Sequence, residues 1–221
     1  MPKAKDVKYT ILEIDIEGDS DLILCKKSRS FEMLEIFKQS HPKGTEVPKT
    51  LLQPYNMWEK LITSVHWMKP IEFHDDDWSK YTEEEWQTYM TENSPVILGK
   101  AFKDALAEAF ISLGFKESTG KAGTDFKRCT EFERICPVSF AQAGYDQHLV
   151  MTNTASKVNV LTQQNVFSGW MTTVKVTLFE RTLPADTLVS MFSAAGTFIG
   201  VGSRRSEGYG RYHVAEVRKY A

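Results

Sequence analysis

The strongest chemical signal in the sequence is a glycine-rich basic stretch near its end, residues 196–214. The stretch contains five glycines together with Arg204, Arg205 and Arg211. Glycine permits positive φ and close approach of the backbone to another group. Backbone N–H groups in such a loop form anion-binding concavities, and guanidinium groups bind phosphate oxygens in planar two-point geometry. The stretch therefore predicts contacts to a phosphodiester backbone, although a tight turn with solvated arginines has the same composition.

The spacing of these glycines is not that of a nucleotide-binding fingerprint. A dinucleotide motif follows the first strand and opens a helix, whereas this loop is expected to follow a helix and open the last strand. The Gly-Lys-Ser/Thr ending of a phosphate-binding loop is absent from it. The sequence therefore favours a nucleic-acid strand over a bound nucleotide cofactor, and no cofactor is expected.

Further basic residues gather at three other places in the chain. They are Lys26, Lys27 and Arg29 before a short helix, Lys121, Lys127 and Arg128 in or next to a loop of glycines and threonines, and Lys157 in a long polar segment. Formal net charge is only −2, with 27 basic and 29 acidic residues. Any grip on nucleic acid must therefore come from such local clusters.

Acid–base chemistry has few candidates. Asp19, Asp21, His148 and His213 are the groups available to act as base or acid beside a ribose 2′-hydroxyl, but the two aspartates are also typical of a turn or a helix cap. The acidic run at 74–77 is expected to be a solvated turn. The three cysteines form no CxxC pair, which predicts reduced thiols and no metal site.

A folded core must position these residues, and the periodicity of apolar residues along the chain predicts its strands and helices. Alternating segments predict strands at 8–16, 135–140 and 172–178 and a final strand from Arg211, and apolar stripes predict helices over 98–113 and 184–196. The order strand, helix, strand, strand, helix, strand is the ferredoxin-like, RRM-like βαββαβ arrangement of the α+β class, an antiparallel sheet with two helices on one face. The polar face of that sheet carries no aromatic residues for base stacking, so binding is expected to run through loops. The residues expected on this polar face are Glu13, Asp15, Thr173, Lys175, Arg211 and His213.

Two segments fall outside this core. Residues 41–95 read as a helical insertion with helical spacing over 57–68, a second helix beginning at Thr82, and four of the five tryptophans. These tryptophans are expected to pack the insertion onto the body of the protein, or else to form a stacking platform for bases or a partner surface. Residues 141–168 read as an irregular polar loop of the kind that is more often functional than decorative. Residues 1–221 are thus predicted to be a single domain with two additions.

The chain resembles the RAMP superfamily, the RRM-like backbone and processing subunits of CRISPR effector complexes, on two stretches. These are Pro95 to Leu106, with its Gly-Lys-Ala-Phe-Lys-Asp-Ala-Leu, and the glycine-rich loop from Gly200 to Tyr212. The match is closer to small standalone RAMP-like proteins of tailed phages, in which Gly-Asp-Ser-Asp-Leu-Ile-Leu at 18–24 also has a counterpart. The resemblance covers about half of the chain, and the helical insertion is a departure from it.

The resemblance implies a noncatalytic protein that binds single-stranded DNA or RNA and oligomerises side by side along the strand. The resemblance implies that the phosphates are contacted by Lys100, Lys103, Gly202, Arg204, Arg205 and Arg211. It also implies that residues 141–168 are a thumb-like loop that reaches a neighbouring subunit. Two alternatives are a metal-independent endoribonuclease and a phage protein that binds a host complex through the 41–95 insertion. The polar N-terminus and the lack of a membrane-spanning stretch predict the cytoplasm, the host's if the protein is phage-encoded.

Overall fold

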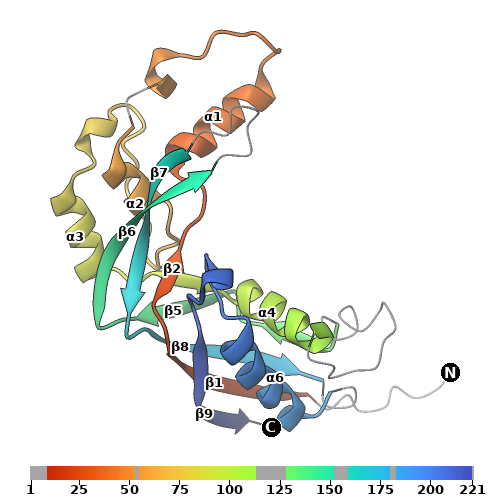
Figure 1. Ribbon diagram of the computed structural model, residues 1–221. Coiled ribbons are helices and arrows are strands. Elements are labelled where there is room, and N and C mark those ends of the chain that lie inside the picture. The colour runs from red at the N-terminus through yellow and green to blue at the C-terminus, as the bar shows by residue number, and fades with distance from the viewer. Residues whose placement is uncertain (1–8, 53–54, 113–127, 152–158, 180–182, 221) are drawn as a thin grey trace. The chain divides into compact units, whose positions relative to one another are not determined.

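A computed structural model describes residues 9–52, 55–112, 128–151, 159–179 and 183–220 of the chain (Figure 1). The chain divides into two compact units. Unit 1 comprises residues 1–23, 97–142 and 167–221, and unit 2 comprises residues 24–96 and 143–166. The insertion expected at 41–95 and most of the thumb-like segment expected at 141–168 thus fall in the same unit.

Unit 1 is built on an antiparallel sheet. Its strands are ordered β3-β5-β8-β1-β9, and β4 also pairs with β8, which makes six strands among the described residues. Their bounds are β1 Thr10–Gly18, β3 Val96–Leu98, β4 Thr130–Phe132, β5 Ile135–Ser139, β8 Met171–Leu178 and β9 Tyr212–Tyr220. The last strand, β9, thus lies on one side of the first strand, β1, and β8 lies on its other side. This is the arrangement that a ferredoxin-like sheet requires, with β8 as the third strand of the βαββαβ core.

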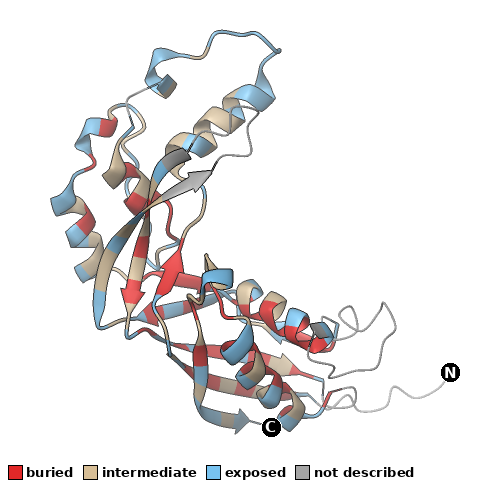
Figure 2. Cartoon of the chain, viewed as in Figure 1, coloured by how far each residue is buried: buried red, intermediate tan, exposed pale blue. Residues whose placement is uncertain are grey.

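Two helices, α4 (Gly99–Ser112) and α6 (Ala185–Phe198), cover one face of this sheet (Figure 1). Side chains of the strands alternate, so Leu12, Ile14 and Ile16 are buried under the helices while the intervening residues are not. Figure 2 shows the same alternation along β8. The predicted α+β, βαββαβ arrangement is therefore confirmed.

Unit 2 holds three α-helices among its described residues, α1 (Arg29–Ser40), α2 (Met57–Thr63) and α3 (Glu83–Glu92), with short 3-10 turns at Lys49–Leu52 and Trp78–Lys80. The helix predicted to begin at Thr82 is confirmed, because the Thr82 hydroxyl accepts a hydrogen bond from the Glu85 N–H at 3.2 Å and caps α3. A three-stranded sheet is ordered β2-β7-β6, with β2 at Leu22–Leu24, β6 at Gln142–Met151 and β7 at Asn159–Ser168.

The prediction of an irregular loop over 141–168 is wrong. The chain forms strands β6 (Gln142–Met151) and β7 (Asn159–Ser168) there. The pattern is hidden because β7 buries amides in place of apolar side chains. Asn165 is fully buried, accepts from the Trp86 indole at 2.9 Å and donates to the Leu61 carbonyl at 2.7 Å. Because these buried amides are hydrogen-bonded, their burial is tolerated, but they give the sequence no alternation of apolar residues.

The tryptophans of the insertion mainly serve packing. Trp78 and Trp86 are buried with Leu61, Ile62 and Tyr81 in the core of unit 2, and Trp58 packs against that core. Trp78 and Trp86 thus pack the interior of unit 2 itself, while the expectation that the tryptophans pack the insertion onto the rest of the chain stays a prediction. Among the described residues, no helix is long and apolar enough to cross a membrane.

Candidate nucleic-acid interface

The glycine-rich loop between α6 and β9 is held against the turn that follows β1. The Ser20 hydroxyl donates to the Gly208 carbonyl at 2.8 Å and accepts from the Arg211 N–H at 2.9 Å. Backbone bonds from Gly210 N–H to the Asp21 carbonyl (2.8 Å) and from Ser203 N–H to the Ile23 carbonyl (2.8 Å) extend the contact. Residues 18–24 and 200–212, two of the three segments on which the resemblance rests, are therefore adjacent in the fold.

The glycines of this loop are required by its backbone. Gly200, Gly202, Gly208 and Gly210 all have positive φ. A Cβ at Gly202 would lie 2.5 Å from the Ile23 carbonyl oxygen. The close approach predicted for these glycines is thus made by Gly202 to the chain's own backbone, and the loop is shaped before any ligand arrives.

The tight loop directs three guanidinium groups toward one pocket of about 390 Å³. It is lined by Glu108, Phe198, Ile199, Arg204, Arg205, Ser206 and Arg211, all in unit 1. Arg204 has φ 54°, a left-handed conformation that is uncommon for a residue with a side chain. We call this group the arginine pocket.

Arg211 is half-buried, as the other two arginines are. Its Nη2 donates to the Arg205 carbonyl at 3.3 Å, and its Nη1 is buried with no hydrogen-bond partner among the described residues. A buried donor without a partner is costly, and a cationic one more so. The unsatisfied nitrogen therefore indicates a place where an anionic oxygen would be stabilised.

Carboxylates pair with the other two arginines. Arg204 forms a two-point ion pair with Glu207, its Nε lying 2.9 Å from Oε1, and its guanidinium lies 5.0 Å from the centre of the Tyr209 ring. Arg205 Nη1 lies 3.3 Å from Glu108 Oε2. A phosphate group would have to replace these carboxylates, which present the same kind of oxygen.

The exposed sheet face is occupied by its own charge network. Arg218 donates to Asp15 Oδ1 at 2.8 Å, and Lys175 lies 3.7 Å from Glu13. The hydrogen bond from Arg218 lowers the pKa of Asp15, with a further bond from Thr173. The expectation that this face carries no aromatic residue is wrong, because Tyr220 of β9 is 45% exposed and donates from its hydroxyl to Glu13 Oε2 at 3.1 Å. The residues expected on the polar face are confirmed except for Arg211, which precedes β9 and lines the arginine pocket instead. The reason is that β9 begins one residue later than expected.

The predicted lysines of α4 are engaged within the chain. Lys100 pairs with Asp104 one turn along the helix, and Lys103 donates to the Thr130 carbonyl at 2.6 Å. Arg128, just before β4, is exposed. None of these three lines the arginine pocket. Lys121, Lys127 and Lys157 lie outside the described residues.

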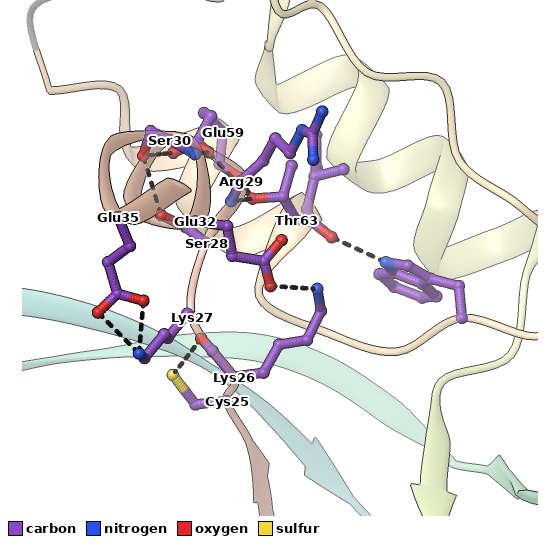
Figure 3. Close-up of polar contacts among 12 residues, drawn as sticks. Cys25, Lys26, Lys27, Ser28, Arg29, Ser30, Glu32, Glu35, Glu59 and Thr63 are labelled. Carbon is purple, nitrogen blue, oxygen red and sulfur yellow. Dashed lines mark hydrogen bonds and ion pairs between the residues drawn. The ribbon is translucent and has the colours of Figure 1, made fainter. Parts of the chain in front are cut away.

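The cluster of Lys26, Lys27 and Arg29 belongs to unit 2, at the start of α1 (Figure 3). Lys27 lies 2.6 Å from Glu35, and Lys26 lies 3.5 Å from Glu32. Arg29 donates twice to Asp75, at 3.1 and 2.7 Å, and this hydrogen bonding raises the pKa of Arg29 above its ordinary value. The cluster is thus neutralised by carboxylates of its own unit.

The acid–base candidates are partly brought together. His213 Nδ1 lies 2.7 Å from Asp19 Oδ1, and Nε2 lies 3.6 Å from Glu17. His148 lies in unit 2, 3.6 Å from Asp146. Asp21 contributes its backbone carbonyl to the loop. No group of three metal-ligating side chains with suitable geometry occurs among the described residues.

Sequence reasoning did not assign a role in the arginine pocket to its lining residues other than the arginines, nor to Ser20, which does not line it. Glu108 comes from α4, Phe198 from the end of α6, and Ser20 fixes the loop beneath. No signal in the sequence marks Phe198, because its 64% exposure at the end of the helix is known only from the fold. The helical stripe alone could not separate it from core residues.

Comparison with solved structures finds a similar fold. Over 96% of this chain and 61% of that chain, at 15% identity and a TM-score of 0.53, it is similar to a chain of the type III-B Cmr-beta complex bound to cognate target RNA. It also matches Cmr6 from Pyrococcus furiosus over 94% of this chain and 98% of that chain, at 9% identity and a TM-score of 0.45. The chain thus spans about three fifths of the Cmr-beta chain. No protein-family model and no curated protein sequence matches it. The likeness to the Cmr-beta chain shows that the two chains share a fold.

Proposed function

We propose that this protein binds a single strand of nucleic acid, with the arginine pocket holding a backbone phosphate. The observation that carries the proposal is the convergence of Arg204, Arg205 and Arg211 on one pocket in which Arg211 Nη1 is buried without a partner among the described residues. A phosphate oxygen would satisfy that nitrogen, and guanidinium groups are suited to phosphate geometry.

The exposed aromatic ring in the same pocket fits a strand better than a free anion. Phe198 would offer a face for one base beside the phosphate site. The Cmr-beta structure of similar fold is bound to target RNA, which favours RNA over DNA. The proposal includes the noncatalytic role and the repetition of subunits along the strand that the RAMP resemblance implies, while the phage origin stays a prediction.

The test is fluorescence anisotropy of labelled oligo-U and oligo-dT with the full chain at low salt. The variant Arg204→Ala/Arg205→Ala is expected to bind at least about tenfold more weakly, because two phosphate-directed charges are lost. The matched control is Arg134→Ala/Lys175→Ala, which removes the same charge from an exposed turn residue and the exposed sheet face. Equal weakening by both variants, or no binding by the unchanged protein, would overturn the proposal.

A second function, RNA cleavage, is favoured by one contact. His213 Nδ1 lies 2.7 Å from Asp19, so Nε2, which faces Glu17 at 3.6 Å, is the nitrogen that would take the proton of a ribose 2′-hydroxyl. The 2′-oxygen would then displace the 5′-oxygen, which takes a proton from water, leaving a 2′,3′-cyclic phosphate and a 5′-hydroxyl. Incubating labelled oligo-U with the protein in EDTA tests this function. Cleavage abolished by His213→Ala and by Asp19→Ala would support it, and an intact strand would exclude it.

A further inference from the structure

A second pocket, of about 470 Å³, is formed by residues of unit 2 alone. It is lined by Tyr55, Asn56, Met57, Trp58, Asp77, Trp78 and Ser79. These residues come from the start of α2 and from the 3-10 turn at 78–80, within the insertion that has no counterpart in the RAMP core. We call it the aromatic pocket.

The aromatic walls are held rigidly. Trp58 lies 5.8 Å from Trp86 and 5.7 Å from Tyr145 between ring centres, with the Tyr145 ring edge-on. Trp78 is buried in the core of unit 2, whereas Tyr55 is 62% exposed at the rim. The pocket therefore offers fixed aromatic surface that is open to a ligand at one side.

Asn56 ties the two walls together. Its Oδ1 accepts from the Trp58 N–H at 2.8 Å and from the Glu59 N–H at 3.2 Å. Its Nδ2 donates to the Trp78 carbonyl at 2.7 Å and to the Tyr81 carbonyl at 3.0 Å. One amide thus fixes the spacing of Trp58 and Trp78, so the pocket is preorganised and binding costs little reordering.

The charge of the pocket is negative. Asp77 is the charged residue among the described residues that line it. Its Oδ1 accepts from Ser79 Oγ at 2.6 Å and from the Ser79 N–H at 3.1 Å, and these bonds lower the pKa of Asp77. The carboxylate therefore stays ionised at neutral pH beside the aromatic rings.

We propose that the aromatic pocket binds the guanidinium group of an arginine presented by a basic segment of a partner protein. Aromatic faces attract cations through their quadrupoles, and a carboxylate supplies the matching charge and hydrogen-bond acceptors. Met57 adds a flexible apolar surface for the aliphatic stem of the arginine. Because this pocket uses none of the residues of the arginine pocket, the inference is independent of nucleic-acid binding.

Charge complementarity is the reason for preferring a basic peptide to a nucleobase. A base would stack on Trp58 or Tyr55, but its phosphate would then lie near Asp77, whereas the neighbouring Asp76 is paired with Lys80 at 3.2 Å and does not line the pocket. A phosphate and the Asp77 carboxylate repel each other. A cationic side chain gains from the same carboxylate.

The experiment is NMR titration of the full chain, observing the Trp58 indole N–H, with three probes: N-acetyl-arginine amide, N-acetyl-citrulline amide and uridine monophosphate. Citrulline has the shape of arginine without its charge. We expect arginine amide to shift the Trp58 resonance and citrulline amide to bind at least about fivefold more weakly, the order of a cation–π contact plus a partly exposed ion pair.

Two matched variants complete the test. Asp77→Asn keeps the oxygen that accepts from Ser79 and loses only the charge, so it is expected to weaken arginine binding about fivefold with the fold intact. Asp76→Asn removes a neighbouring charge that does not line the pocket and is expected to leave arginine binding within about twofold. The proposal is overturned by equal binding of arginine and citrulline, by tighter binding of uridine monophosphate, or by no shift with arginine up to saturation of its solubility.

Discussion

The Ser20 hydroxyl accepts a hydrogen bond from the Arg211 N–H at 2.9 Å, across 191 positions of sequence. The same hydroxyl donates to the Gly208 carbonyl, so the Ser20 side chain joins the turn after β1 to two residues of the glycine-rich loop, Gly208 and Arg211. The placement of Arg211 therefore depends on a residue that contacts no ligand in the proposed function.

Replacing Ser20 with alanine is expected to lower the free energy of unfolding by about 1–3 kcal/mol, because a backbone donor and a backbone acceptor lose their partner. Strand binding should weaken as well, since Arg211 is no longer fixed. Urea unfolding and oligo-U anisotropy measure the two effects. Ser190→Ala, on the exposed side of α6, is the control and should leave binding unchanged. Unchanged stability in Ser20→Ala would contradict the role given to this contact.

Gly202 and Gly208 separate two reasons for glycine in the loop. Both have positive φ, but an added Cβ at Gly202 would meet the Ile23 carbonyl whereas one at Gly208 would meet nothing within 4 Å. Gly208→Ala should therefore cost only the strain of its backbone, about 1 kcal/mol, and Gly202→Ala should cost about 1–3 kcal/mol more. Thermal unfolding of the two variants gives the comparison. Equal losses of stability in the two variants would show that the backbone around Ile23 moves to accommodate the added Cβ at no cost in stability.

Much of unit 1 could be predicted from the sequence because its signals are local. Leu12, Ile14 and Ile16 alternate, and the apolar stripe of α4 runs without interruption to its end. The β6–β7 strands could not be predicted, because buried Gln163 and Asn165 read as loop residues. Their hydrogen-bond partners lie far away in sequence, because Asn165 is bonded to Trp86 and Leu61 and Gln163 accepts from the Tyr55 hydroxyl.

The candidate site was predicted in its residue types but not in its surroundings. The three arginines stand out in the sequence, yet the carboxylates that neutralise Arg204 and Arg205 are known only from the fold, since Glu108 comes from another helix. The same holds for Lys26, Lys27 and Arg29, whose acidic partners include Asp75 from elsewhere in unit 2. Charge pattern finds cations, whereas tertiary structure decides which are neutralised.

Glu207 is expected to compete with phosphate for Arg204. Glu207→Gln removes the negative charge of the ion pair and should tighten oligo-U binding about two- to fivefold at low salt, the order of a surface ion pair. Glu131→Gln, exposed on β4 of the same unit, controls for net charge. If both variants gain equally, the effect is general electrostatics and the competition is absent.

Asp15 should make stability sensitive to acid. Its pKa is lowered in the folded protein by the Arg218 hydrogen bond, so its stabilising contribution is present above its ordinary pKa of about 4 and is lost as pH falls through the lower, folded value. Asp15→Asn is expected to be less stable than the unchanged protein at pH 7, with the difference shrinking at lower pH. Unfolding by urea at pH 7 and at pH 3 checks this, and a difference that grows toward pH 3 would have the wrong sign.

The salt dependence of oligo-U binding tests the central claim most directly, because it counts phosphate contacts. For a single strand the slope of log affinity against log salt is about −0.7 per phosphate contact. Arg204→Ala/Arg205→Ala is predicted to make that slope shallower by about 0.7 to 1.4, whereas Arg134→Ala/Lys175→Ala leaves it unchanged. An unchanged slope in the arginine-pocket variant would contradict the account, since the strand would then be held elsewhere.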